Sequence, residues 1–179
     1  MINNKILIKD NLMEKALPTT NEIEVRHVDI VVSKADIEGD IEYANPIFYK
    51  LSGYNKKELA HEPHSILRHP DMPTVIFKHL WSELKQGKEV YAFIKNLTKD
   101  KSFYWVYAYI RPAFNPDGSL RNYVSTRKTM NIEARNIIEP LYHKLLEAEK
   151  SQTIEESEKL LKEFINNRDF NTLMANIQG

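Results

Sequence analysis

Three long runs of β-branched and aromatic residues in the middle of the chain constrain its fold more than any other feature. They cover residues 90–98, 103–114 and 122–129, and the short segments between them, 99–102 and 115–118, are rich in turn-forming residues. This spacing predicts an antiparallel meander of three strands. Upstream, residues 28–32 and 41–44 flank a Glu-Gly-Asp turn and predict a hairpin that adds two more strands.

The segment between the hairpin and the meander predicts helices. Asn45-Pro46 is a helix start, because Asn caps free amides and Pro fits the first turn, and we expect this helix to end at Ser52-Gly53. Residues 55–58 predict a capping box, and a longer amphipathic helix is expected between Pro73 and Gly87. The fold class predicted is α+β, a five-stranded antiparallel sheet with helices on one face. Such an arrangement leaves room for a small ligand between the layers.

Composition excludes several classes of function. Lys+Arg 25 against Asp+Glu 25 gives no net charge, which argues against a nucleic-acid partner. The absence of cysteine excludes disulfides, thiolate metal sites and a cysteine nucleophile, and no histidine and carboxylate spacing indicates a metal site. No apolar stretch of about 20 residues and no secretory signal is present, so we expect a cytoplasmic protein that is not inserted in the membrane. No motif of an enzyme active site is found, so we expect no catalytic activity.

A proline- and histidine-rich run, Pro-His-Ser-Ile-Leu-Arg-His-Pro-Asp-Met-Pro, occupies residues 63–73. With Ser52-Gly53-Tyr54, Tyr104-Trp105-Val106, the Tyr123, Ser125 and Arg127 series and Glu139-Pro140-Leu141-Tyr142, it resembles the PAS domain of bacterial aerotaxis receptors over about residues 25–146. The resemblance implies a PAS fold that binds FAD without a covalent bond, with the redox state of the flavin as the signal. One departure from the family is Val90 beside Tyr91, where an aromatic residue is usual.

The family's receptors continue into a membrane anchor and a signalling rod, whereas this sequence stops at Gly179. The chain therefore resembles the soluble PAS subunit of a two-piece energy-taxis receptor. The expected function is a redox or energy-state sensor in chemotaxis, and the expected partner is a membrane-bound chemotaxis receptor. Homodimerisation stays open.

The resemblance also implies a set of cofactor-binding residues, and each has a structural alternative. Arg68 and His69 are expected to bond the flavin ring or its phosphate arm, while Asp71 either does the same or caps the helix at Pro73. Polar strand residues are expected to bond the edge of the ring unless they face outward, and Trp81 is expected beside the ring unless it is plain core. The candidates are Arg68, His69, Asp71, Trp81, Asn96, Asn45, His64 and Ser125.

Three other functions remain open at this point. A histidine could hold haem, as in some PAS domains. A cofactor-free domain could bind a partner through a sheet surface formed by Tyr107, Tyr109 and Tyr123. An FAD-dependent reductase would need a substrate site that no motif indicates.

We divide the chain into an N-terminal helical cap or tether (residues 1–24), a PAS sensor domain (25–130) and a C-terminal helical coupling segment (131–179). Pro140 is expected at the start of the C-terminal helix. The apolar stripe of this segment has no predicted strand left to cover, so it must fold back on the sheet, pair with a second copy or dock on the receptor. The stripe consists of Leu141, Leu145, Ile154, Leu161, Phe164 and Ile165.

Overall fold

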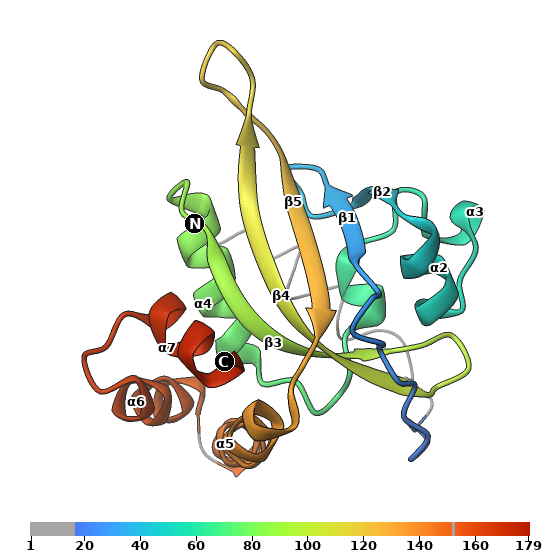
Figure 1. Cartoon of the computed structure of the whole chain (residues 1–179). Coiled ribbons are helices and arrows are strands. Elements are labelled where there is room, and N and C mark those ends of the chain that lie inside the picture. The colour runs from blue at the N-terminus through green and yellow to red at the C-terminus, as the bar shows by residue number, and fades with distance from the viewer. Residues whose placement is uncertain (1–16, 152) are drawn as a thin grey trace.

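The computed structural model describes residues 17–151 and 153–179. Most of the N-terminal helical cap or tether predicted for residues 1–24 lies outside the described residues. The described chain forms one antiparallel sheet with helices packed around it (Figure 1).

The predicted five-stranded antiparallel sheet is confirmed. Its strands lie in the order β2-β1-β5-β4-β3, and all neighbours are antiparallel. The hairpin therefore pairs with the last strand of the meander, which puts β1 and β5 in the interior of the sheet and β3 at an edge. The strands are β1 (Val31–Ala35), β2 (Ile41–Ala44), β3 (Val90–Leu97), β4 (Phe103–Phe114) and β5 (Leu120–Thr129).

Strand β1 begins three residues later than predicted. The Asp29 carboxylate accepts hydrogen bonds from the Arg26 backbone N–H at 3.2 Å and from the Arg26 guanidinium at 2.7 and 3.0 Å. This pairing holds residues 26–29 in a turn, so the β-branched Val28 stays exposed rather than joining the sheet.

The helices before the meander follow the local sequence signals. Asn45 caps α2 (Pro46–Ser52) by accepting from the Phe48 backbone N–H, and Gly53 ends that helix at φ 74°. The predicted capping box forms at the start of α3 (Lys56–Leu59), where the Asn55 and Glu58 side chains accept from each other's backbone N–H groups. A short 3₁₀ helix, η2 (His64–Leu67), then leads to α4 (Thr74–Lys85).

The N-terminus of α4 is capped from a distant part of the chain. Asp71 was an alternative cap for this helix, and that alternative is wrong, because Asp71 instead pairs with Lys95. The Glu149 carboxylate accepts from the backbone N–H groups of Thr74 at 2.8 Å and Val75 at 2.9 Å. A side chain 75 positions away in sequence thus caps this helix, a role usually filled by a residue next to the helix start.

The C-terminal segment forms α5 (Ile132–Ser151), α6 (Ile154–Ile165) and α7 (Phe170–Gln178). The prediction that a helix begins at Pro140 is wrong, because Pro140 lies inside α5. Helix α5 starts earlier, where the Asn131 side chain accepts from the Ala134 backbone N–H at 2.6 Å. Ile138 before the proline and Leu145 after it are both fully buried, so packing on both sides of Pro140 holds the helix although proline lacks one backbone hydrogen bond.

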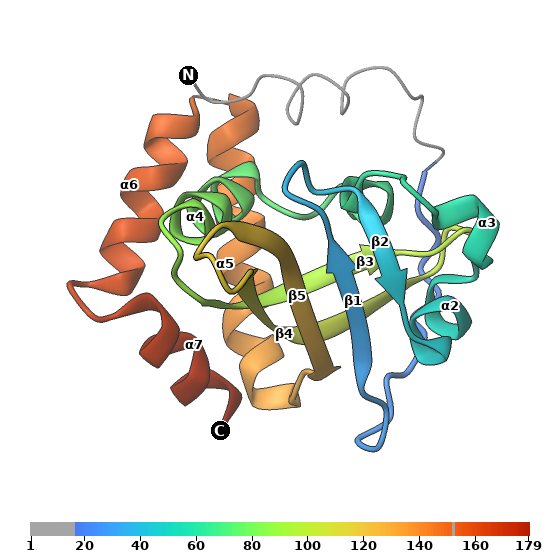
Figure 2. The same ribbon diagram turned by 90° about the horizontal axis from the view of Figure 1, so that it is seen from above.

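These helices cover the open edge of β3 and the adjoining helix α4, at one side of the sheet (Figure 2). The Tyr91 N–H donates to the Asn171 side chain at 2.8 Å, and the Tyr142 hydroxyl donates to the Phe93 carbonyl at 2.8 Å. A strand edge left open would expose these backbone groups to other chains. The C-terminal segment therefore stabilises the domain it follows.

The apolar stripe of the C-terminal segment folds back on the domain, which is one of the three routes that the sequence left open. Leu145 is fully buried and Leu161 is 5% exposed, and the other four residues of the stripe are partly buried. Exposure of the stripe on a lone domain is therefore not observed.

Candidate cofactor site

A polar cluster lies on the sheet face that α2, η2 and α4 cover, here called the inner face, with Ser33 and Arg127 buried and His64 partly buried. Arg127 on β5 donates to the Ser33 hydroxyl on β1 at 3.0 Å and contacts Nε2 of His64 on η2 at 3.3 Å. Ser33 Oγ also lies 2.8 Å from that His64 nitrogen. Because arginine can only donate, Nε2 accepts, and the Ser33 hydroxyl donates its proton to it. We call these three residues the inner cluster. Their contacts connect strands β1 and β5 to the short helix η2.

The charges of the inner cluster are unusual for a protein interior. Arg127 is 5% exposed, and burial lowers its pKa to about 10, so the guanidinium remains charged at neutral pH. Burial, followed by the nearby Arg127 charge, lowers the pKa of His64 to about 3, so this imidazole is neutral. The cluster therefore holds one positive charge beside neutral partners.

Three more polar side chains belong to the same face. Tyr104 is fully buried, its hydroxyl has no hydrogen-bond partner among the described residues, and burial raises the pKa of that hydroxyl to about 12, with the Arg127 charge acting in the opposite direction. The buried Asn96 lies opposite Tyr104 in the β3–β4 ladder. Ser125 lies directly opposite Ser33 in the β1–β5 ladder. Its buried Oγ has no hydrogen-bond partner among the described residues. An unpartnered buried hydroxyl is costly, so this position suits a ligand that supplies the missing bond.

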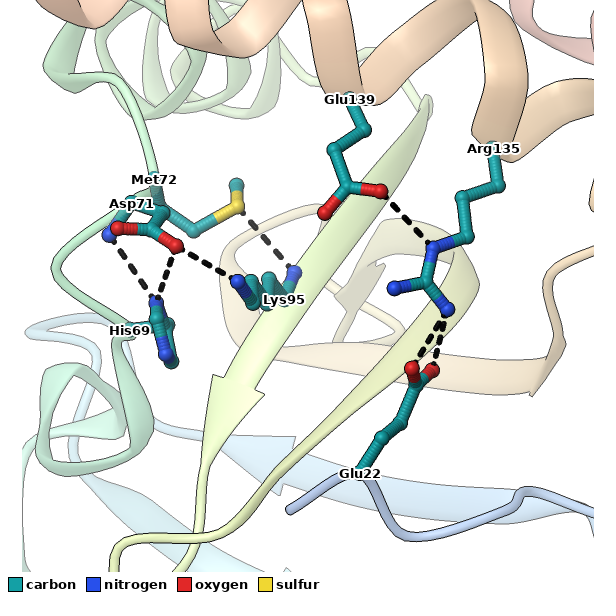
Figure 3. A network of polar contacts seen from close by, with 7 residues as sticks. All are labelled: Glu22, His69, Asp71, Met72, Lys95, Arg135 and Glu139. Atoms are coloured by element: carbon teal, nitrogen blue, oxygen red, sulfur yellow. Dashed lines mark hydrogen bonds and ion pairs between the residues drawn. The ribbon is translucent and has the colours of Figure 1, made fainter. Parts of the chain in front are cut away.

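A second cluster lies at the β3 edge and contains most of the motif residues 68–72 (Figure 3). The Asp71 carboxylate lies 2.6 Å from the Lys95 ammonium and 3.5 Å from Nδ1 of His69. Burial raises the pKa of Asp71, but the Lys95 hydrogen bond and charge outweigh it and hold the pKa below its usual value. The Lys95 N–H also donates to the Met72 sulfur at 3.2 Å. These contacts fasten the motif to the strand.

Arg68 and His69 hold the same loop in shape. The Arg68 guanidinium donates to the Met72 carbonyl and to the Thr74 hydroxyl, both at 3.1 Å. His69 is 2% exposed, accepts from the Asp71 backbone N–H at 3.1 Å and packs edge-on against Phe103. The geometry therefore gives both residues contacts within the protein.

The last two candidates lie apart from both clusters. The Asn45 side chain accepts from the Val32 and Phe48 N–H groups and donates to the Ile30 carbonyl, so its polar atoms are used by the backbone. Trp81 is partly buried on α4 and packs edge-on against Tyr123, with ring centroids 5.3 Å apart.

Six of the eight candidates thus divide between two places, and Asn45 and Trp81 lie in neither. His64, Asn96 and Ser125 lie in or beside the inner cluster, whereas Arg68, His69 and Asp71 lie at the β3 edge. Sequence reasoning missed Arg127, Tyr104 and Ser33. For Arg127 a signal existed, because it continues the period-two series of Tyr123 and Ser125 and so shares their buried face.

The tyrosine surface predicted for partner binding does not form as expected. Tyr107 and Tyr109 share the outer face of β4, where both stack with Tyr91. Tyr123 pairs with Pro112, whose side chain lies on the opposite face of β4 from Tyr107 and Tyr109. The Tyr123 ring contacts Trp81 on the inner face. Alternation along a strand therefore separates it from the other two.

A cavity of about 160 Å³ lies between the chain before β1, the end of β5 and the start of α5, and none of the eight candidates lines it. Its cation, Arg135, already pairs with Glu22 at 2.6 Å and with Glu139 at 3.0 Å (Figure 3). Within residues 17–151 and 153–179, no helix is long and apolar enough to cross a membrane, and no group of three metal-ligating side chains gathers.

Comparisons with known proteins indicate the same fold as the structure. Residues 41–127 match the family described as "PAS fold". These residues have the PAS fold. It is 36% identical over 115 residues to the "Aerotaxis receptor" of Escherichia coli, which confirms the resemblance stated above, and 27% identical over 108 residues to the "Nitrogen fixation regulatory protein" of Klebsiella pneumoniae. These alignments cover 64% and 60% of the chain, and 22% of each relative.

Solved structures show the same PAS architecture. The light-state structure of the blue-light photoreceptor Aureochrome1 LOV matches 68% of this chain and 91% of that chain, with a TM-score of 0.54 at 18% identity. At this identity the match shows the fold alone. The inner cluster lies within the matched PAS domain, apart from Ser33, which precedes it on β1.

Proposed function

We propose that this chain is a signalling sensor whose PAS domain binds FAD without a covalent bond and reports its redox state. The observation that carries the proposal is the inner cluster, a set of buried polar groups with an unpartnered Ser125 hydroxyl. A flat ring with carbonyl and ring-nitrogen acceptors suits this donor set. The similarity to an aerotaxis receptor supports a role in energy taxis.

FAD would supply a ring that accepts and releases electrons. The chain's own residues bind and orient it: Asn96 and Ser125 offer hydrogen bonds from the strands, and Arg127 offers a buried positive charge. The ion pair between Asp71 and Lys95 holds the loop before α4 against the edge of β3. A change in the ring alters the domain only if the two redox states bind with different affinity.

We further propose a cytoplasmic location, a membrane-bound chemotaxis receptor as partner, and no enzymatic activity. A pull-down with the cytoplasmic part of such a receptor, with and without dithionite, tests the partner. Analytical ultracentrifugation decides whether the chain forms a homodimer. Steady-state NADH oxidation by the purified protein would contradict a purely sensory role.

The deciding experiment is an absorbance spectrum of the purified protein after incubation with FAD and gel filtration. We expect flavin bands that bleach with dithionite. A second sample is incubated with haem in the same way, where a sharp Soret band would favour haem. A colourless protein in both samples would refute cofactor sensing.

Arg68→Ala and His69→Ala are expected to lower the ratio of FAD to protein after gel filtration while the domain still folds. Arg68 fixes the loop through the Met72 carbonyl and the Thr74 hydroxyl, so its loss should loosen the loop beside β3. Arg121→Ala, which removes an exposed cation from β5, is the matched control. Ratios equal to those of the wild type and control would contradict a role in retention.

A further inference from the structure

The single positive charge of Arg127 has no counter-ion in the described structure. Its polar contacts are the Ser33 hydroxyl and the neutral His64 ring, and the Tyr104 hydroxyl that influences its pKa is un-ionised. No carboxylate of residues 17–151 or 153–179 contacts its guanidinium. Buried charges in proteins are normally paired, because an isolated one costs stability.

The surroundings of Arg127 suit an aromatic anion. The guanidinium lies 5.6 Å from the centre of the Phe48 ring, in a layer that also holds the fully buried Tyr104. Guanidinium carries five N–H donors, and two neighbours, Ser33 and His64, accept from it. Donor capacity therefore remains for a ligand.

The single charge of Arg127 indicates which part of the FAD molecule it contacts. Two electrons and one proton added to an oxidised flavin ring leave one negative charge, spread over the ring. A diphosphate carries more charge in a strongly hydrated form, and the inner cluster offers it only one cation. The delocalised ring anion is the better match for a single cation packed against an aromatic side chain.

We propose, resting on the proposed function, that Arg127 is the counter-charge of the reduced flavin ring and so sets the redox potential of the sensor. Arg127 binds the negatively charged reduced ring more tightly than the neutral oxidised ring. When an electron donor such as dithionite reduces the ring, the added negative charge would attract the guanidinium and weaken its contacts with its neutral partners, Ser33 on β1 and His64 on η2. The change in charge thereby reaches a strand and a helix of the domain.

The test compares Arg127→Lys, which keeps the charge, with Arg127→Gln, which removes it, in the full chain. We expect Arg127→Gln to lower the affinity for reduced relative to oxidised FAD by tenfold or more. For a two-electron couple each factor of ten lowers the midpoint potential by about 30 mV. Arg127→Lys should stay near the wild type. Lys128→Gln, next on β5 but exposed, is the matched control and should leave the potential unchanged.

A second measurement uses the protein without flavin. If Arg127 lacks a protein counter-ion, the flavin-free Arg127→Gln protein should melt no lower than the flavin-free Arg127→Lys protein. A clearly lower melting temperature for Arg127→Gln would show that the charge stabilises the empty fold, and would refute the inference. An unchanged potential in Arg127→Gln would also refute it. Failure of the wild-type protein to retain FAD would refute the proposed function instead.

Discussion

Replacing Glu149 tests whether the C-terminal helices stabilise the PAS domain. The Glu149 carboxylate accepts from the Thr74 and Val75 N–H groups at the start of α4, and from the fully buried Ser157 hydroxyl on α6 at 3.3 Å. Glu149→Ala would leave two backbone donors without an acceptor, one of them on Val75, which is 2% exposed. A lost cap costs about 0.5–2 kcal/mol, and a hydrogen bond to a charged group about 1.5–3 kcal/mol.

We therefore expect Glu149→Ala to lower the free energy of unfolding by about 2–3 kcal/mol, or roughly 5–10 °C in melting temperature for a chain of this size. Glu149→Gln keeps the shape and one good acceptor, so it should cost about 1 kcal/mol. Urea unfolding followed by circular dichroism measures both. The control is Glu147→Ala, because the Glu147 side chain is 66% exposed on the same helix. A loss for Glu149→Ala no larger than that of the control would refute the capping role.

Three other predictions follow from the structure. The His64 pKa falls from 6.5 to about 3 on folding. Between these two pH values the His64 imidazole is protonated in the unfolded chain and neutral in the folded chain. Stability should therefore fall with pH below 6.5, by about 2 kcal/mol at pH 5, and a urea titration should show a flatter profile for His64→Asn. Trp81→Ala should lower the flavin-free melting temperature through a loss of about 2–3 kcal/mol, less than for a fully buried tryptophan, and an unchanged value would exclude packing against Tyr123. Truncation after Met130 should unfold or strongly destabilise the domain by circular dichroism, and a shortened chain as stable as the full one would contradict the edge cover on β3.

Much of the fold could be predicted because its signals are local. Period-two runs with short polar turns between them predict the meander. Asn45 and Asn55 each accept from backbone N–H groups no more than three residues away, so they mark two helix starts locally. The start of β1 was wrong because the bidentate Arg26–Asp29 pair holds a turn where β-branched residues favour a strand. The expected helix start at Pro140 is wrong because burial of Ile138 before the proline and Leu145 after it outweighs the helix-breaking tendency of proline.

The strands, the early helices and the resemblance of the central domain to PAS domains can be predicted from the sequence alone, since each depends on residues close in the chain or on a continuous motif. Which side chains meet, in contrast, depends on the tertiary structure. It placed Arg127 against Ser33 and His64, 94 and 63 positions away, and it capped α4 with Glu149. It also put the motif's Asp71 on Lys95 at the β3 edge rather than in the inner cluster. Strand order and helix docking bring such residues together, and neither is encoded at a fixed spacing along the chain.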